Sequence, residues 1–137
     1  MSKVRVMFVC IGNACRSQMA EGFAKAYGGD VMEVMSSGLS PYTHVPMGTR
    51  ESMAEKGISL ETHFPKHIME FDTGQVDLVV NISGARLDWN ACPVKVWPVK
   101  DPFGGDEDAY RAARDRIEKL VMELVLEVRQ GGVERRA

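Results

Sequence analysis

The chain has 137 residues, of which 45% are hydrophobic and 26% are charged, and its formal net charge is −2 at pH 7. This length and composition predict one domain with a proper hydrophobic core over residues 1–130, followed by a frayed tail over residues 131–137. The charge gives no electrostatic reason to expect nucleic acid or an anionic membrane as a partner, and no apolar run approaches the roughly 18 residues of a membrane helix. We expect an N-terminal strand instead of a signal peptide and three cysteines kept reduced, which favour the cytoplasm.

The first part of the chain predicts a strand, a loop, a helix and a second strand. Residues 3–9 are rich in β-branched and apolar side chains, which is typical of a strand in a parallel sheet. Residues 17–28 predict a helix with a pair of glycines as its stop, and residues 31–36 predict the second strand. The loop at residues 10–17 then opens at the carboxyl edge of the sheet, where open α/β sheets bind their ligands.

The rest of the chain predicts two more strands and two more helices. Residues 46–56 suit a helix, residues 77–82 a buried strand and residues 94–99 a fourth strand, with a loop over residues 83–93. Residues 106–129 carry apolar side chains at helical spacing and predict a long amphipathic helix. We therefore expect a three-layer α/β fold with four parallel strands and helices on both faces.

Residues 10–17 read Cys-Ile-Gly-Asn-Ala-Cys-Arg-Ser and predict a loop that encloses phosphate or another tetrahedral oxyanion. Backbone N–H groups at the start of a helix have no intrahelical partner and bind anions. Gly12 and Asn13 tolerate the unusual dihedral angles of such a loop, and Arg16 adds a planar fork of donors. Cys10 would lie at the bottom of the loop, where these groups favour a thiolate that can attack a bound phosphorus or arsenic atom.

Other functions for these residues have less support. A zinc site built from Cys10, Cys15, Cys92 and a histidine lacks the spacing of a zinc knuckle, and the loop lacks the Gly-Lys-Ser/Thr of a nucleotide P-loop. We expect neither a metal nor a cofactor. A phosphate-binding or redox-sensing module without catalysis remains a third hypothesis.

These residues resemble the low-molecular-weight protein tyrosine phosphatase family, which shares its superfamily with the thioredoxin-coupled arsenate reductases. The family signature Cys-x5-Arg-Ser is matched at residues 10–17, and further likeness lies at residues 36–38, 57–58, 77–80 and 101–103. The resemblance implies the strand order 2-1-3-4. It also assigns phosphate binding to the loop residues Ile11, Gly12, Asn13, Ala14, Cys15 and Ser17.

The resemblance implies a phosphomonoesterase with a phosphocysteine intermediate and Cys10, Arg16 and Asp101 as catalytic residues. Asp101 would protonate the leaving oxygen and later accept a proton from the attacking water. Phe103 and Tyr42 would line the cleft. The alternative for Tyr42 is an ordinary exposed loop tyrosine. The expected substrates are phosphotyrosine proteins or small aryl phosphates.

Two further residues would support the loop if the resemblance holds. Ser37 would order Asn13 and Cys10, and His63 would form a hydrogen bond with Asn13. The alternatives are an unspecific turn serine and a surface histidine.

The choice between phosphatase and arsenate reductase rests on few positions. Reductases of this superfamily carry oxidation outward through two further cysteines, and the first of those positions is Ser83 here, whereas Cys92 matches the second. Ile11 favours the phosphatase, while residues 18–22 resemble the reductases. We predict a phosphatase, with the alternative of a reductase in which Cys10 pairs with Cys92 or is resolved by thioredoxin or a low-molecular-weight thiol.

Cys15 has two interpretations. It is either a small buried thiol beneath the loop or the partner of Cys10 in a reversible disulfide that shields the nucleophile.

Overall fold

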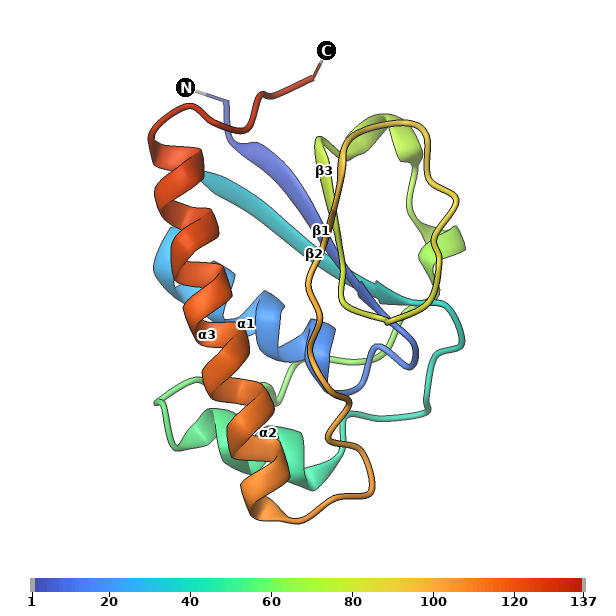
Figure 1. Ribbon diagram of the computed structural model, residues 1–137, viewed down its shortest axis with the longest axis vertical. Coiled ribbons are helices and arrows are strands. Elements are labelled where there is room, and N and C mark those ends of the chain that lie inside the picture. Colours follow the sequence, from blue (N-terminus) through green and yellow to red (C-terminus); the bar gives the residue numbers. More distant parts are fainter. Residues whose placement is uncertain (1, 137) are drawn as a thin grey trace.

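Four parallel strands in the order β2-β1-β3-β4 form the centre of the structure, a computed structural model that describes residues 2–136 (Figure 1). The strands are β1 (Val4–Cys10), β2 (Met32–Gly38), β3 (Leu78–Asn81) and β4 (Val94–Val96). The α-helices are α1 (Arg16–Gly28), α2 (Met47–Ala54) and α3 (Glu107–Arg129), and the 3-10 helices are η1 (Ile68–Glu70) and η2 (Thr73–Gln75). The predicted α/β class and strand order are confirmed.

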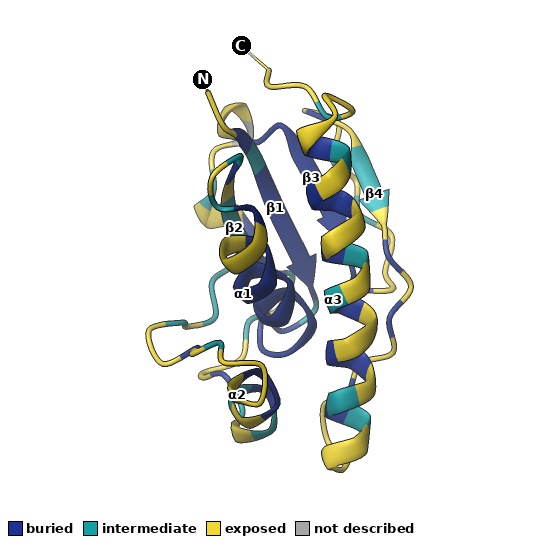
Figure 2. Ribbon diagram, turned by 90° about the vertical axis from the view of Figure 1, so that its left-hand side faces the viewer, coloured by how far each residue is buried: buried dark blue, intermediate teal, exposed yellow. Residues whose placement is uncertain are grey.

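Successive side chains of β1 enter two different cores because strand residues alternate between the faces of a sheet. Phe8 lies in the larger core with Phe23 of α1 and Ile117 of α3, and all three are fully buried. Val9 lies in a second core with Ile68 of η1. The α-helices α1 and α3 thus cover one face, whereas the other face is covered by η1, η2 and coil. Figure 2 shows α1 buried except in its last turn and α3 exposed along its outer side.

The fourth strand is shorter than the predicted residues 94–99. Its last residue is Val96, and the N–H of Trp97 still donates to the carbonyl oxygen of Asn81 at 3.0 Å. Pro98 follows with its nitrogen on the outer edge of the sheet, and the carbonyl oxygen of Val99 accepts from Arg16 at 3.0 Å. The chain beyond this point is free to curve toward the loop at the end of β1.

The last described residues return to the sheet although the sequence predicts a frayed tail. The N–H of Arg136 donates to Oδ1 of Asp77 at 2.6 Å, and Nη2 of Arg5 donates both to the same oxygen and to the carbonyl oxygen of Arg136, each at 2.8 Å. Asp77 is 1% exposed, and a buried carboxylate needs such donors. The two ends of the chain therefore lie together, at the end of the sheet away from α2 (Figure 1).

None of the helices within residues 2–136 combines the length and the apolar character needed to span a membrane.

Replacing Asp77 with Asn should reduce the acid sensitivity of folding. Burial alone would raise the pKa of Asp77, but the hydrogen bonds from Arg5 and from the backbone N–H groups of Arg136 and Arg5 lower it from 3.8 to about 2. A carboxyl with a depressed folded pKa stabilises the fold above about pH 4 and loses that contribution as the pH falls toward 2, here about 2–3 kcal/mol. We expect Asp77→Asn to lower the free energy of unfolding by that amount at neutral pH and far less near pH 2.

Urea denaturation of both proteins across this pH range is the measurement. The exposed Asp88, which pairs with Arg86 at the surface, gives the matched control Asp88→Asn. Parallel pH profiles for wild type and Asp77→Asn would contradict the assignment.

Candidate functional site

The loop between β1 and α1 is shaped by the chain that follows β2. Carbonyl oxygens of the loop accept backbone N–H bonds from that chain: Cys10 from Leu39 (3.2 Å), Ile11 from Ser40 (2.8 Å) and Gly12 from Tyr42 (2.9 Å). In a trans peptide the N–H points opposite to the C=O, so the N–H groups of the loop are aimed at its interior. Gly38 permits this close approach, since a Cβ there would lie 2.8 Å from both the Asn13 nitrogen and the Ile11 oxygen.

The side chain of Asn13 connects the loop to several other elements by hydrogen bonds. Its φ of 48° makes it the one non-glycine residue with a positive φ within residues 2–136, and asparagine tolerates this region better than most residues. Its Nδ2 donates to Oγ of Ser17 at 2.7 Å and to Oγ of Ser36 at 3.0 Å, while its Oδ1 accepts from the N–H of Lys66 at 2.8 Å. One buried side chain therefore joins β1, β2, α1 and the segment before η1.

The expectation for Ser37 is wrong, because Ser36 makes the contact. Oγ of Ser37 donates to Sδ of Met7 at 3.3 Å and does not bond Asn13 or Cys10. Adjacent residues of β2 point to opposite faces of the sheet, and only Ser36 faces the loop. Sequence spacing alone could not decide between two consecutive serines.

His63 supports the loop through an intermediate residue, not directly as the resemblance implied. Its Nδ1 lies 2.9 Å from Oε1 of Gln18, and Nε2 of Gln18 donates to the carbonyl oxygen of Asn13 at 3.0 Å. Burial is the main cause that lowers the pKa of His63. Gln18 was missed as a site residue, although a glutamine within an apolar helix face is a signal that its amide has a buried partner.

The thiol of Cys10 lies beneath the loop and is 3% exposed. Its Sγ is 2.9 Å from Oγ of Ser17. Because Oγ of Ser17 already accepts a hydrogen bond from Asn13, its own proton is available for the sulfur. Ser17 can therefore donate a hydrogen bond to Sγ of Cys10.

Arg16 presents one edge of its guanidinium to the loop interior. Its Nη1 donates to the carbonyl oxygens of Ile82 (2.7 Å) and Val99 (3.0 Å), which hold the side chain in place. Nη2 lies 3.5 Å from Oδ2 of Asp101, and the buried Nε has no hydrogen-bond partner among residues 2–136. A buried N–H without a partner is costly, so an oxyanion that accepts from Nε and Nη2 together fits this site.

The rim of the loop carries the predicted acid and two aromatic rings. The side chain of Asp101 is 40% exposed, and its Oδ1 accepts from the N–H of Phe103 at 3.1 Å. The rings of Tyr42 and Phe103 lie 4.8 Å apart between centroids. The ring of Tyr42 also covers Gly12, where a Cβ would approach it to 2.9 Å. The structure therefore brings Asp101, Tyr42 and Phe103 to one loop.

Cys15 is buried within the same loop and is not paired with Cys10. Burial is the main cause that raises its pKa to about 11, so Cys15 is a neutral thiol near pH 7. The side chains of Thr49 and Tyr110 lie against it. Its place in the larger core matches the interpretation as a packing residue.

Cys92 is the predicted residue that lies away from the loop. It is 8% exposed in the second core, and its Sγ accepts from Nε1 of Trp89 at 3.2 Å. The residue after Cys92, Pro93, accepts a hydrogen bond from the N–H of Val79, and Val79 pairs with residue 7 of β1. Cys92 therefore lies near the level of residue 7 of β1, which is three strand residues, or about 10 Å, before Cys10. A disulfide needs Cα atoms within about 7 Å, so the loop over residues 83–93 must move before the two cysteines can pair.

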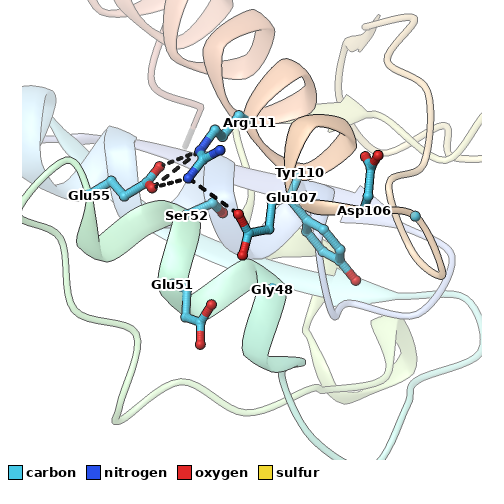
Figure 3. Close-up of a pocket in the computed structure, with 9 residues that line it drawn as sticks. Gly48, Glu51, Ser52, Glu55, Asp106, Glu107, Tyr110 and Arg111 are labelled. Carbon is cyan, nitrogen blue, oxygen red and sulfur yellow. Dashed lines mark hydrogen bonds and ion pairs between the residues drawn. The ribbon is translucent and has the colours of Figure 1, made fainter.

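A separate cavity of about 490 Å³ lies between α2 and the start of α3 (Figure 3). Its lining residues are Gly48, Glu51, Ser52, Glu55, Gly105, Asp106, Glu107, Tyr110 and Arg111. Arg111 is committed to Glu55 by three hydrogen bonds, so the cavity is acidic and disfavours anions. It contains none of the loop residues. Within residues 2–136, no group of His, Cys, Asp and Glu side chains is arranged to hold a metal ion.

The fold and the loop define an α/β protein that binds an oxyanion above a buried cysteine. The chain belongs to the low molecular weight phosphotyrosine protein phosphatase family, whose profile matches residues 5–134. This confirms the resemblance seen in the sequence and makes the protein an enzyme of that superfamily.

Similar proteins include both reductases and phosphatases. The glutaredoxin arsenate reductase of Synechocystis sp. is 32% identical over 129 residues, covering 90% of this chain and 98% of that one. The arsenate reductase of Bacillus subtilis is 37% identical over 114 residues, covering 83% and 80%.

Two solved structures show the same fold. One, described as an arsenate reductase in the phosphate binding state, has a TM-score of 0.86 at 32% identity and covers 91% of this chain and 98% of its own. The other is a mutant of the YwlE arginine phosphatase with a phosphorylated active site serine, at a TM-score of 0.84 and 25% identity, with coverage of 93% and 97%.

Replacing Arg16 with Lys should lower the affinity for phosphate on the order of a hundredfold, because an ammonium cannot bind two carbonyl groups and still offer a fork to an oxyanion. Titration calorimetry with inorganic phosphate measures this. Arg111→Lys, at a surface arginine outside the loop, is the matched control. Equal affinities for the two variants would rule out Arg16 as the main side-chain ligand.

Proposed function

We propose that the protein reduces arsenate, with Cys10 as the nucleophile and an external thiol as the reductant. The observation that carries the proposal is the buried thiol of Cys10 in a loop whose Arg16 has a buried Nε without a hydrogen-bond partner among residues 2–136. Similarity to arsenate reductases over nine tenths of the chain supports arsenate as the oxyanion. Phosphatase activity, which the sequence alone favoured, becomes the second candidate.

The chemistry is balanced by two external thiols for each arsenate. The thiolate of Cys10 displaces one arsenate oxygen, which takes up two protons and leaves as water, and a sulfur–arsenic bond forms. An external thiolate then attacks the sulfur of Cys10, and the electron pair of the sulfur–arsenic bond stays with arsenic, which leaves as arsenite. A second external thiol attacks the resulting mixed disulfide and releases Cys10 together with an external disulfide. Arg16 and the loop N–H groups hold the oxyanion throughout.

The thiol is proposed to be external because the chain lacks a relay close to Cys10. Ser83 stands where the resemblance places the first relay cysteine. Its Oγ donates to Oδ1 of Asn81 at 2.6 Å and accepts from the N–H of Ala85 at 3.0 Å, while Nδ2 of Asn81 donates to the carbonyl oxygen of Ala85 at 2.9 Å. These bonds fix the start of the loop that would have to carry Cys92 toward Cys10.

Two cysteine variants test the external thiol. Cys10→Ser should abolish arsenate-dependent oxidation of glutathione supplied with glutaredoxin, whereas Cys92→Ser should keep most of it. Mass spectrometry of the wild type after arsenate and one equivalent of glutathione should find the mixed disulfide at Cys10. The opposite result would be that Cys92→Ser has no turnover with any reductant, while the wild type turns over with thioredoxin. That result would make Cys92 the resolving thiol.

The second candidate is hydrolysis of aryl phosphate monoesters. Asp101 at the rim and the paired rings of Tyr42 and Phe103 favour it, because an aromatic leaving group needs both a proton donor and an apolar wall. In this reaction Cys10 would form a phosphocysteine, and Asp101 would protonate the leaving oxygen and then accept a proton from water.

Asp101→Asn should slow hydrolysis of p-nitrophenyl phosphate on the order of 10²–10⁴-fold, because the amide cannot supply a proton to the leaving group. Its affinity for phosphate should change little, since Arg16 and the loop N–H groups remain. Steady-state kinetics together with phosphate inhibition separate the two effects. Unchanged hydrolysis in Asp101→Asn would exclude this residue as the acid, and arsenate reduction that persists in the same variant would favour the first candidate.

A further inference from the structure

Gln18 is buried in the first turns of α1, and all its polar atoms are used. It is 0% exposed, and its Nε2 donates to the carbonyl oxygens of Asn13 at 3.0 Å and Phe64 at 3.2 Å. Its Oε1 lies 2.9 Å from Nδ1 of His63. The sequence singled out residues 18–22 only for their likeness to the reductases, yet this side chain reaches back under the oxyanion loop.

The hydrogen-bond pattern fixes the orientation of the amide and the tautomer of His63. Both N–H groups of the Gln18 amide point at carbonyl oxygens, which can only accept, so Oε1 must face a donor. His63 therefore carries a proton on Nδ1, and because its pKa is lowered mainly by burial it is neutral near pH 7. His63 in turn prevents the amide from flipping.

The carbonyl held by Gln18 belongs to the peptide between Asn13 and Ala14. Asn13 has the positive φ of the loop, and such a peptide can rotate when nothing holds it. While Gln18 binds the carbonyl oxygen behind the loop, the N–H of Ala14 must point the opposite way, toward the loop interior. If the peptide rotated, a carbonyl oxygen would replace an N–H group at the oxyanion.

We infer that Gln18, oriented by His63, is a positioning residue that keeps the Asn13–Ala14 peptide turned toward the bound oxyanion. The inference rests on the proposed function only in that the loop binds a tetrahedral oxyanion, and it holds for arsenate and phosphate alike. It predicts an effect on oxyanion affinity that is separate from any effect on folding.

Titration calorimetry with inorganic phosphate and with arsenate, under reducing conditions, tests the role without requiring turnover. Gln18→Met keeps the side-chain size and removes the donors, and we expect both anions to bind about tenfold more weakly. The stoichiometry should stay near one. A misfolded fraction would lower the stoichiometry instead. Gln130→Met, at an exposed glutamine after α3, is the matched control and should bind as the wild type does.

A second pair of variants tests the part played by His63. His63→Leu removes the donor to Gln18 and should weaken binding several-fold, whereas His63→Asn offers an amide N–H near the place of Nδ1 and should restore most of it. Affinities in Gln18→Met equal to those of the control would overturn the inference. A wild type that bound neither anion would overturn the oxyanion loop itself and the proposed function with it, so the two failures are distinguishable.

Discussion

The site depends on one backbone constraint: the carbonyl groups of the oxyanion loop must point outward so that its N–H groups point inward. The chain after β2 binds the carbonyl oxygens of residues 10–12, and Gln18 binds that of Asn13. The N–H groups then act together with the start of α1 to create a positive potential, which favours a bound oxyanion. Much of the structure around β1 therefore supplies hydrogen-bond donors to the loop carbonyl groups and no reactive groups.

Arg16 extends the same logic to a side chain. Its Nη1 donates to two carbonyl oxygens, that of Ile82 just after β3 and that of Val99 just after β4. These carbonyl groups are free because strand pairing has ended there, and the parallel order 2-1-3-4 places both beside the loop that follows β1. The guanidinium is thus fixed before any ligand binds, and only its Nε and Nη2 edge is left to recognise one.

The sequence was sufficient for the sheet and for the loop because both leave local signals: apolar runs for the buried strands, and Cys-x5-Arg for the oxyanion loop. It failed where the deciding contact depends on orientation or on distant partners. Ser36 and Ser37 differ only in the face of β2 to which they point, and Gln18 is explained only by a carbonyl oxygen and a histidine 45 positions away. The docking of the C-terminal segment likewise depends on Asp77, whose partner lies 59 positions along the chain.

The two proposed reactions, reduction and hydrolysis, would both begin with attack by Cys10 and would differ in what next reaches the adduct on its sulfur. Water needs a base, and Asp101 stands at the rim in a position to serve. A thiol must reach the sulfur of Cys10, a residue that is 3% exposed in a loop whose rim carries the rings of Tyr42 and Phe103, so a small thiol meets fewer steric obstacles than a folded protein does. Cys92 is itself buried, and the bonds of Ser83 to Asn81 and Ala85 hold the start of the loop that would have to carry it toward Cys10. Ser83, which the resemblance places at the first relay cysteine of the reductases, makes structural hydrogen bonds here, and this supports the proposal of an external reductant.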